Sequence, residues 1–339
     1  MASATKLITS IALLQCVERG LFDLDEPLTD IAPEFKDREI LTHVEDGHCS
    51  RVKSRVPITA RHLLSHTSGF GYAFTHQLLM RRAQTQKDEP KTLKVPERYD
   101  MPLVFEPGTG WLYGCSLDWA GAIVSRVHNG MTLDEYFVEN VWKPLGLSAP
   151  FPRFNIARHP DYNARLLRAV KLVGNTLEHQ DVWGFDNPVG QDGGAGLSAT
   201  AKDFTAVLAD LISETPRLLK TSTIDTMFVP QLVPNSSSIT DLLALRPAWD
   251  AVTGPISEDM VNHGLGGILC LGAVPEIRQP KGMLAWGGAS NIIWWINREA
   301  GVAGFFGTQQ GPFGNKNIVK LANAWKKDFW TKHEAINRV

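Results

Sequence analysis

The feature that most constrains the fold of this chain is an apolar helix that the sequence predicts almost at its start. Gly20 ends a run of apolar residues at helical spacing, which are Leu7, Ile8, Ile11, Leu14 and Val17. Ser3 lies where an N-terminal cap residue belongs. Because residues 11–14 are apolar on every side, we expect the helix to be buried on more than one face, at the centre of a domain.

Ser3 and Lys6 are three residues apart and therefore share one face of this helix, one turn apart. Serine is a weak nucleophile that needs a base within hydrogen-bonding reach. A lysine serves as that base when burial and the positive end of a helix dipole favour the neutral amine. The same helix N-terminus offers N–H groups to a developing oxyanion. We therefore interpret Ser3 as a nucleophile and Lys6 as its base, with a plain helix cap as the alternative.

The same serine–lysine spacing occurs at Ser50 and Lys53, in a polar stretch that we expect to be a loop. Chance alone gives about one such pattern in a chain of this size. Ser3 differs from Ser50 in its context, since only Ser3 opens a helix that is predicted to be buried.

The composition is that of an ordinary globular protein, with 339 residues of which 43% are hydrophobic and 21% charged. A formal net charge of -2 with scattered basic residues predicts neither a nucleic-acid partner nor a membrane partner. No apolar run approaches the ~18 residues that span a bilayer. The four cysteines lack CxxC spacing, so we expect free buried thiols, a cytoplasmic location and no cofactor.

The predicted elements change character along the chain. Residues 23–56 are polar and predict irregular structure, and the middle of the chain predicts helices after Thr59, Ser116, Thr132 and Thr200. Strand-like runs follow at residues 265–271, 283–286, 291–296 and 302–308, and a last helix from about Asn317 turns Leu321 inward. Helices in the middle followed by sequential strands indicate an α+β fold.

Four segments together resemble the serine β-lactamase and penicillin-binding-protein superfamily. They are residues 2–7, 58–69, 111–121 and 286–289, and their order and spacing match that superfamily over essentially the whole chain. The resemblance implies a single domain with an antiparallel sheet flanked by helices, plus a mainly helical lobe. We expect the helical lobe at about residues 40–200 and the sheet lobe at about 1–30 and 260–339. Members of the superfamily have the first strands of the sheet ahead of the serine, so we expect this sequence to lack those strands.

The resemblance also implies roles for individual residues. Tyr113 would be the second proton-transfer group, working with Lys6. The backbone N–H groups of Ser3 and Ala289, which follows Gly288, would form an oxyanion hole. The positions that match the substrate pocket are Arg98, Trp183, Trp286 and Phe313.

Two departures from the lactamase pattern bear on the substrate. Cys115 stands two residues after the tyrosine, where lactamases usually have an asparagine that positions the β-lactam amide. Trp286 begins the third motif, where lactamases have a lysine or histidine that binds the drug carboxylate. Both departures replace polar recognition by apolar surface, which favours an ester or thioester with a bulky hydrophobic alcohol.

Within the superfamily, the chain resembles the fungal transesterases that acylate polyketide-type natural products. This resemblance implies an acyltransferase that takes an acyl group from a thioester onto Ser3 and passes it to an alcohol of a secondary metabolite. Its partners would be a small-molecule acceptor and a thioester donor, which a carrier protein or polyketide synthase could supply. The alternatives are a carboxylesterase for small or hydrophobic esters, and a truncated, non-catalytic family member that acts as a binding protein.

Two other patterns have simpler interpretations. His62 and His66 are four apart, as metal ligands on a helix would be, but the glutamate of a metalloprotease helix is absent, so we predict no metal site and favour a surface or cap role. Residues 193–196 form a glycine-rich stretch without the flanking strand or the lysine of a phosphate loop. We interpret this stretch as a turn near the site.

Overall fold

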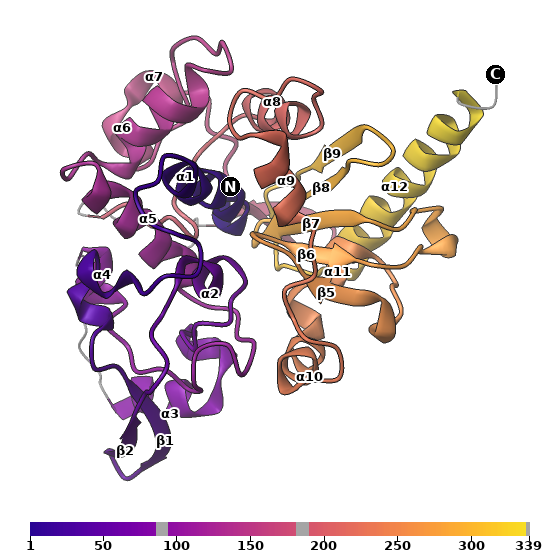
Figure 1. Cartoon of the computed structure of the whole chain (residues 1–339). Helices are drawn as coiled ribbons and strands as arrows, with labels where there is room; N and C mark the ends of the chain where they lie inside the picture. Colours follow the sequence, from indigo (N-terminus) through magenta and orange to yellow (C-terminus); the bar gives the residue numbers. More distant parts are fainter. Residues whose placement is uncertain (86–93, 181–189, 337–339) are drawn as a thin grey trace.

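The computed structural model describes residues 1–85, 94–180 and 190–336 of the chain. Figure 1 shows a mainly helical half and a half built around a β-sheet, with helix α1 (Thr5–Glu18) where the two halves meet. This arrangement agrees with the predicted α+β class. The residue boundaries of two lobes remain a prediction.

The main sheet is a five-stranded antiparallel meander in which each strand pairs with the next one along the chain. Its strands are β5 (Val261–His263), β6 (Ile268–Cys270), β7 (Met283–Gly288), β8 (Ile292–Asn297) and β9 (Val302–Phe306). The last four coincide with the predicted strand-like runs. The short connections from β7 to β8 and from β8 to β9 leave no room for a crossover, so these neighbours must run antiparallel.

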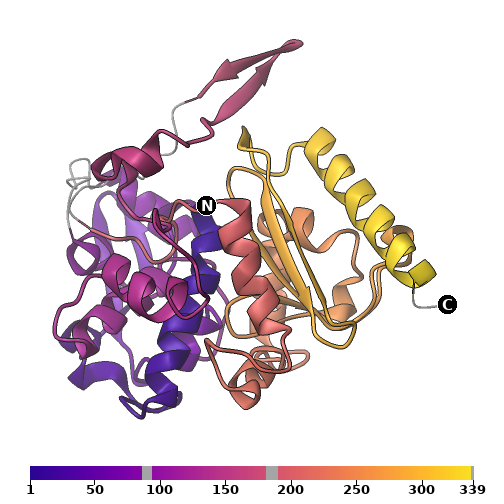
Figure 2. The ribbon, with the colours of Figure 1, turned by 90° about the horizontal axis from the view of Figure 1, so that it is seen from above.

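Helices cover both faces of this sheet (Figure 2). Successive residues of a strand point to opposite faces, so the side chains of Trp294 and Trp295 of β8 pack on opposite faces of the sheet. Trp295 packs against α12 (Lys316–Ile336), where its ring centroid lies 5.2 Å from that of Trp330. On the other face, Phe204 of α8 (Ala201–Leu211) packs against Phe305 at 5.3 Å.

Helix α1 is buried along almost its whole length, because every residue from Thr5 to Cys16 is buried. The prediction of a central helix covered on more than one face is therefore confirmed. Its main neighbour is α5 (Ser116–Val127), with further contacts to α6 (Leu133–Phe137). The helix ends at Glu18, and Gly20 follows with a φ of 68°, which a glycine adopts without strain.

Three of the predicted helix caps are present. The side chains of Thr59, Thr132 and Thr200 each accept a hydrogen bond from the backbone N–H three residues later. They begin α2 (Ala60–Leu64), α6 and α8. The fourth prediction was displaced by one residue, since Cys115 occupies the cap position of α5 and Ser116 is already helical.

The prediction of irregular structure up to residue 56 was wrong for residues 39–53. Strands β1 (Glu39–Glu45) and β2 (His48–Lys53) form an antiparallel hairpin there. Asp46 and Gly47 at its turn have φ values of 47° and 82°, the positive angles that favour an Asp-Gly hairpin. Ser50 and Lys53 thus lie exposed on a strand rather than in a loop.

The remaining elements are short. Strands β3 (Val170–Val173) and β4 (Thr176–His179) form a hairpin that projects from the body in Figure 2, and β10 (Gln310–Gly311) runs parallel to β3. The other α-helices are α3 (Gln77–Thr85), α4 (Val95–Arg98), α7 (Pro160–Asn163), α9 (Thr221–Met227), α10 (Ser237–Ala244) and α11 (Asp250–Thr253).

All four cysteines are unpaired, as expected. Cys16, Cys115 and Cys270 are buried, whereas Cys49 on β2 is only half-buried. Within the described residues, no helix combines the length and the apolar character needed to cross a membrane.

The packing of α12 on the sheet is testable with two substitutions on that helix. Trp330 is 2% exposed, whereas Leu321 is 54% exposed and not inward as predicted. Trp330→Ala leaves a cavity beside Trp295 and is expected to lower the free energy of unfolding by about 3–5 kcal/mol. Leu321→Ala is the control and is expected to change it by less than about 0.5 kcal/mol. Equal effects in urea denaturation would contradict this account of the core.

Candidate active site

Ser3 lies in the 3₁₀ turn η1 (Ala2–Ala4), which leads directly into α1. It does not cap the helix, because no side chain caps η1 or α1, so the plain-cap alternative was wrong. Its Oγ instead accepts a hydrogen bond from Tyr113 Oη at 2.5 Å. The turn therefore presents the serine hydroxyl to a second hydroxyl from a segment 110 residues away in sequence.

Tyr113 lies just ahead of α5, in a segment that passes very close to the backbone of residues 70–71. A Cβ on Gly114 would lie 2.4 Å from the carbonyl oxygen of Phe70, so only glycine allows this approach. Thr75 Oγ1 adds a hydrogen bond to the carbonyl oxygen of Tyr113 at 2.9 Å. The backbone at Tyr113 and Gly114 is thus held in place, with the phenol of Tyr113 at Ser3.

Lys6 is 2% exposed and donates two hydrogen bonds. Its Nζ lies 2.7 Å from the carbonyl oxygen of Gly194 and 3.3 Å from Tyr72 Oη. It also lies 4.8 Å from the ring centroid of Tyr113. Among the described residues Lys6 makes no hydrogen bond with Ser3, so Tyr113, which bonds to Ser3 and lies beside the Lys6 amine, is the group next to both.

Asp118 completes the surroundings of Lys6. This carboxylate is fully buried in the first turn of α5 and accepts hydrogen bonds from Tyr72 Oη and from the N–H of Gly194, both at 2.9 Å. Burial, with the nearby Asp192 carboxylate, raises the pKa of Asp118 to about 6. Tyr72 and Asp118 were not predicted from the sequence. A carboxylate between the apolar residues Leu117 and Trp119 was the available signal, since buried charges need partners.

The glycine-rich stretch 193–196 is a turn at the site, as predicted, and its glycines let it lie directly on α5. A Cβ on Gly193 would lie 2.6 Å from the carbonyl oxygen of Leu117, and a Cβ on Gly194 2.5 Å from Asp118 Oδ2. Thr9 Oγ1 of α1 donates to the carbonyl oxygen of Gly193 at 2.6 Å. The turn is therefore held between α1 and α5.

Arg98, at the end of α4, forms an ion pair with Asp192, which is 4% exposed. Asp192 also accepts, through its carbonyl oxygen, the N–H groups of Ala195 and Gly196. The guanidinium of Arg98 thus supports the turn that carries Gly194. Its predicted role in the substrate pocket remains a prediction.

Aromatic rings form one wall of the site behind Tyr113. The centroids of Trp286 on β7 and of His66 both lie 5.2 Å from that of Tyr113. His263 and Trp111 extend this wall, because the ring centroid of His263 lies 5.7 Å from those of His66 and Trp111. Both histidines are buried. Burial lowers the pKa of His66 well below its ordinary value and that of His263 to about 4, so both imidazoles are neutral near pH 7.

The end of β7 lies against the turn that carries Ser3. A Cβ on Gly288 would lie 2.3 Å from the carbonyl oxygen of Met1, so this contact requires glycine. Ala289 is the next residue, and Asn291 then hydrogen-bonds with its Nδ2 to the carbonyl oxygens of Gln310 and Pro312. The predicted oxyanion residues therefore come from adjacent elements. Their role as an oxyanion hole remains a prediction.

The last two predicted pocket residues are Phe313 and Trp183. Phe313, in the loop after β10, is half-buried and packs against the main core. Trp183 lies outside the described residues.

No group of three side chains suited to hold a metal ion occurs in the part of the chain that the structure describes. His62 acts in a helix cap, because its Nδ1 accepts the N–H of Thr59 at 3.3 Å. His66 belongs to the aromatic wall.

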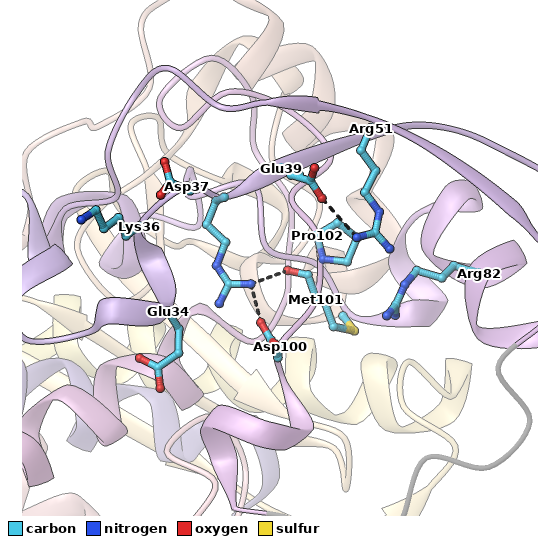
Figure 3. A pocket seen from close by; sticks show the side chains of 10 residues that line it. Glu34, Lys36, Asp37, Glu39, Arg51, Arg82, Asp100, Met101 and Pro102 are labelled. Atoms are coloured by element: carbon cyan, nitrogen blue, oxygen red, sulfur yellow. Dashed lines mark hydrogen bonds and ion pairs between the residues drawn. The ribbon is translucent and has the colours of Figure 1, made fainter.

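A separate polar pocket lies where β1 and β2 approach residues 100–102 (Figure 3). Two ion pairs join residues that line it: Arg38 with Asp100 at 2.6 Å, and Arg51 with Glu39 at 3.2 Å. None of the residues described at Ser3 lines it.

Comparisons with known proteins give one consistent picture. The family model described as Beta-lactamase matches residues 1–326. The acyltransferase calJ of Penicillium decumbens is 62% identical to this chain, and the match covers 99% of this chain and 81% of the relative. The lovastatin esterase of Penicillium rubens is 36% identical, and the match covers 99% of this chain and 85% of the relative. Among solved structures, a mutant simvastatin synthase (LovD6) from Aspergillus terreus superposes with a TM-score of 0.87 at 32% identity, over 99% of this chain and 81% of that one.

The Tyr113–Ser3 hydrogen bond yields a direct prediction. Tyr113→Phe removes the hydroxyl that touches Ser3 Oγ and is expected to slow acylation of the serine by about 10²–10⁴-fold, as loss of a proton-transfer group does. A stopped-flow assay with p-nitrophenyl butyrate measures this rate. Tyr162→Phe, which deletes a phenol hydroxyl on α7, is the control and should react at the wild-type rate. Equal rates for both variants would contradict the role of Tyr113.

The neutral His263 predicts a pH dependence of stability. Between pH 6.5 and about 4 the unfolded chain binds a proton at this residue that the folded chain does not, so the folded state loses stability as the pH falls. The loss is at most ~1.4 kcal/mol per pH unit. His263→Gln should lack this contribution, so its free energy of unfolding should fall less steeply than that of the wild type. Parallel slopes in urea titrations would contradict the burial of a neutral imidazole.

Proposed function

Because this chain belongs to the β-lactamase family, we propose that it is an acyltransferase that works through an acyl-Ser3 intermediate. It moves an acyl group from a thioester to an alcohol of a polyketide-type secondary metabolite. The observation that carries the proposal is the 2.5 Å hydrogen bond between Tyr113 and Ser3, with the buried Lys6 amine at the ring of the same tyrosine.

In the first half-reaction Ser3 Oγ attacks the thioester carbonyl carbon. The serine proton passes to Tyr113, as Tyr113 gives its own proton to unprotonated Lys6. When the carbon–sulfur bond breaks, the proton returns along the same path to the leaving thiolate, which departs as a thiol. Two observations support this path. Tyr113 makes a short hydrogen bond to Ser3, and in the described structure Lys6 makes hydrogen bonds to Tyr72 and Gly194 but none to Ser3.

In the second half-reaction the acceptor alcohol attacks the acyl-Ser3 carbonyl and loses its proton to the Tyr113–Lys6 pair. Ser3 recovers a proton as it leaves. In both steps the N–H groups of Ser3 and Ala289 would stabilise the negative charge on the carbonyl oxygen. The contact between Gly288 and Met1 supports this assignment because it holds the two elements together.

The apolar wall supports an ester or thioester over a β-lactam. Trp286 packs on Tyr113 where lactamases place a cationic side chain. Cys115 is fully buried and contacts the carbonyl oxygen of Gly71, so it offers no polar group to a β-lactam amide. The similarity to proteins named as an acyltransferase and as simvastatin synthase favours transfer to an alcohol of a polyketide-type product.

Hydrolysis is the second candidate, because one relative is named as a lovastatin esterase. Transfer and hydrolysis share the same acyl-enzyme and differ only in whether an alcohol or water attacks it. A carboxylesterase would use Ser3, Tyr113 and Lys6 in the same roles. The hydrogen-bonded serine and the buried lysine argue against a non-catalytic binding protein.

The thioester donor could be carried by a carrier protein or a polyketide synthase, or could be a free small thioester.

The four unpaired cysteines are consistent with a reducing compartment such as the cytoplasm.

Replacement of the nucleophile tests the proposal. Ser3→Ala should abolish covalent labelling by a fluorophosphonate probe and all acyl transfer, because no other hydroxyl occupies its position. Ser50→Ala is the matched control, since Ser50 has the same spacing to Lys53 but lies exposed on β2, and it should label fully. Persistent labelling of folded Ser3→Ala protein, located by peptide mass spectrometry, would reject Ser3 as the nucleophile.

Product analysis separates transfer from hydrolysis. With a short-chain acyl thioester and a hydroxylated polyketide, we expect an ester product that depends on Ser3. Liquid chromatography with mass spectrometry measures ester and free acid together. Free acid as the sole product over a panel of polyketide alcohols would favour the esterase.

A further inference from the structure

We propose that Asp118 is a positioning residue for acyl transfer, which orients the Lys6 amine through Tyr72 and through the main chain of Gly194. This proposal rests on the function proposed above for Lys6 and Tyr113. It assigns a role to three residues that surround the lysine amine, which are Tyr72, Asp118 and Gly194.

The four groups form a closed ring of hydrogen bonds. Lys6 Nζ donates to Tyr72 Oη at 3.3 Å and to the carbonyl oxygen of Gly194 at 2.7 Å. Tyr72 Oη donates to Asp118 Oδ2, and the N–H of Gly194 donates to Asp118 Oδ1, both at 2.9 Å. The two oxygens of one carboxylate therefore hold both acceptors of the lysine.

The carboxylate fixes the direction of the two hydrogen bonds that the Tyr72 hydroxyl makes in this ring. An ionised carboxylate only accepts hydrogen bonds, so Tyr72 must turn its proton toward Asp118. Its oxygen lone pairs are then left to accept from Lys6. A neutral lysine amine has two N–H bonds and one lone pair. Tyr72 and Gly194 accept the two N–H bonds, so the lone pair is available to Tyr113, whose ring centroid lies 4.8 Å from Lys6 Nζ. Asp118 thereby decides which way the lysine lone pair faces.

Asp118 also supplies charge where Lys6 must become an ammonium during the reaction. The other groups with which the carboxylate interacts are Asp192, Tyr72, Tyr99 and Cys115. Arg98 pairs with Asp192, so the buried cluster contains two carboxylates, one guanidinium and the Lys6 amine. An ammonium formed at Lys6 is more stable next to a buried negative charge than alone in a low-dielectric site.

Protonation of Asp118 would undo this arrangement. Burial raises the pKa of this carboxyl, so it takes up a proton at a higher pH than an exposed aspartate. A neutral carboxyl no longer compels Tyr72 to donate to it and no longer balances the charge of Lys6. Acylation should therefore decline as the pH falls through about 6.

Asp118→Asn is the sharpest test, because it keeps the shape of the side chain and reverses one hydrogen bond. The amide oxygen can still accept from Gly194, but the amide nitrogen donates to Tyr72. Tyr72 then turns its proton toward Lys6 and competes for the lone pair. We expect the single-turnover rate of Ser3 acylation by p-nitrophenyl butyrate to fall roughly 10- to 100-fold, with KM nearly unchanged. This loss is smaller than that of removing a general base, because Lys6 itself is kept.

Two further variants accompany it. Tyr72→Phe removes the hydroxyl that links Asp118 to Lys6 and should slow acylation in the same way. Asp210→Asn is the control: Asp210 is a buried aspartate on α8 that accepts the N–H groups of Arg217 and Leu218, away from Lys6. It should acylate at the wild-type rate per folded molecule. All rates are measured from pH 5 to 9 on protein whose folded fraction is known from active-site titration and thermal melting.

The pH profile separates positioning from a purely structural role. We expect folded Asp118→Asn to be slow and to lack the decline near pH 6. A wild-type rate and profile per titrated site would overturn the proposal, even if fewer sites were titrated. If Asp118→Asn fails to fold, Tyr72→Phe decides: a slow folded variant supports the proposal and a wild-type rate overturns it. Failure of the Ser3→Ala test would instead reject the proposed function itself.

Discussion

The burial of one lysine side chain is the constraint on which this site depends. An amine in the protein interior must find hydrogen-bond acceptors, because leaving it unpaired is strongly unfavourable. Lys6 finds them in Tyr72 and Gly194, which come from a loop after α2 and from the turn at residues 193–196. Each acceptor is held by Asp118 of α5. The loop after α2, the turn at residues 193–196 and helix α5 therefore meet at the first turn of α1, where they satisfy the hydrogen bonds of one buried amine.

The second condition for the site is the meeting of the two halves of the molecule at η1. Ser3 belongs to this turn, Tyr113 comes from the helical half, and Trp286 comes from the sheet. The contact of Gly288 with the carbonyl oxygen of Met1 brings the end of β7 as close to the turn as backbone atoms allow. Ser3, the proposed nucleophile, is therefore placed between the hydroxyl of Tyr113 and the end of strand β7.

Local patterns predicted many of the elements correctly. Caps at Thr59 and Thr132 follow from the chemistry of their own side chains, and the C-terminal strands are short apolar runs separated by turns. The β1–β2 hairpin was missed because β2 is exposed along most of its length and β1 buries residues without alternation, so no period of two marks it. Leu321 was misplaced because α12 rests on the sheet through Trp330 and its neighbours, a contact that helical spacing alone does not orient.

The sequence by itself determined that Ser3 and Lys6 lie about one turn apart at the start of the first helix, since that depends only on their spacing of three residues. Its resemblance to known motifs placed Tyr113 and Trp286 beside them. The tertiary structure alone decided that Tyr113 reaches Ser3 and that Lys6 binds Tyr72 and Gly194, partners that lie 110, 66 and 188 residues away. Helical spacing fixes neighbours one turn apart, whereas these contacts depend on the close packing of segments that meet only when the whole chain is folded.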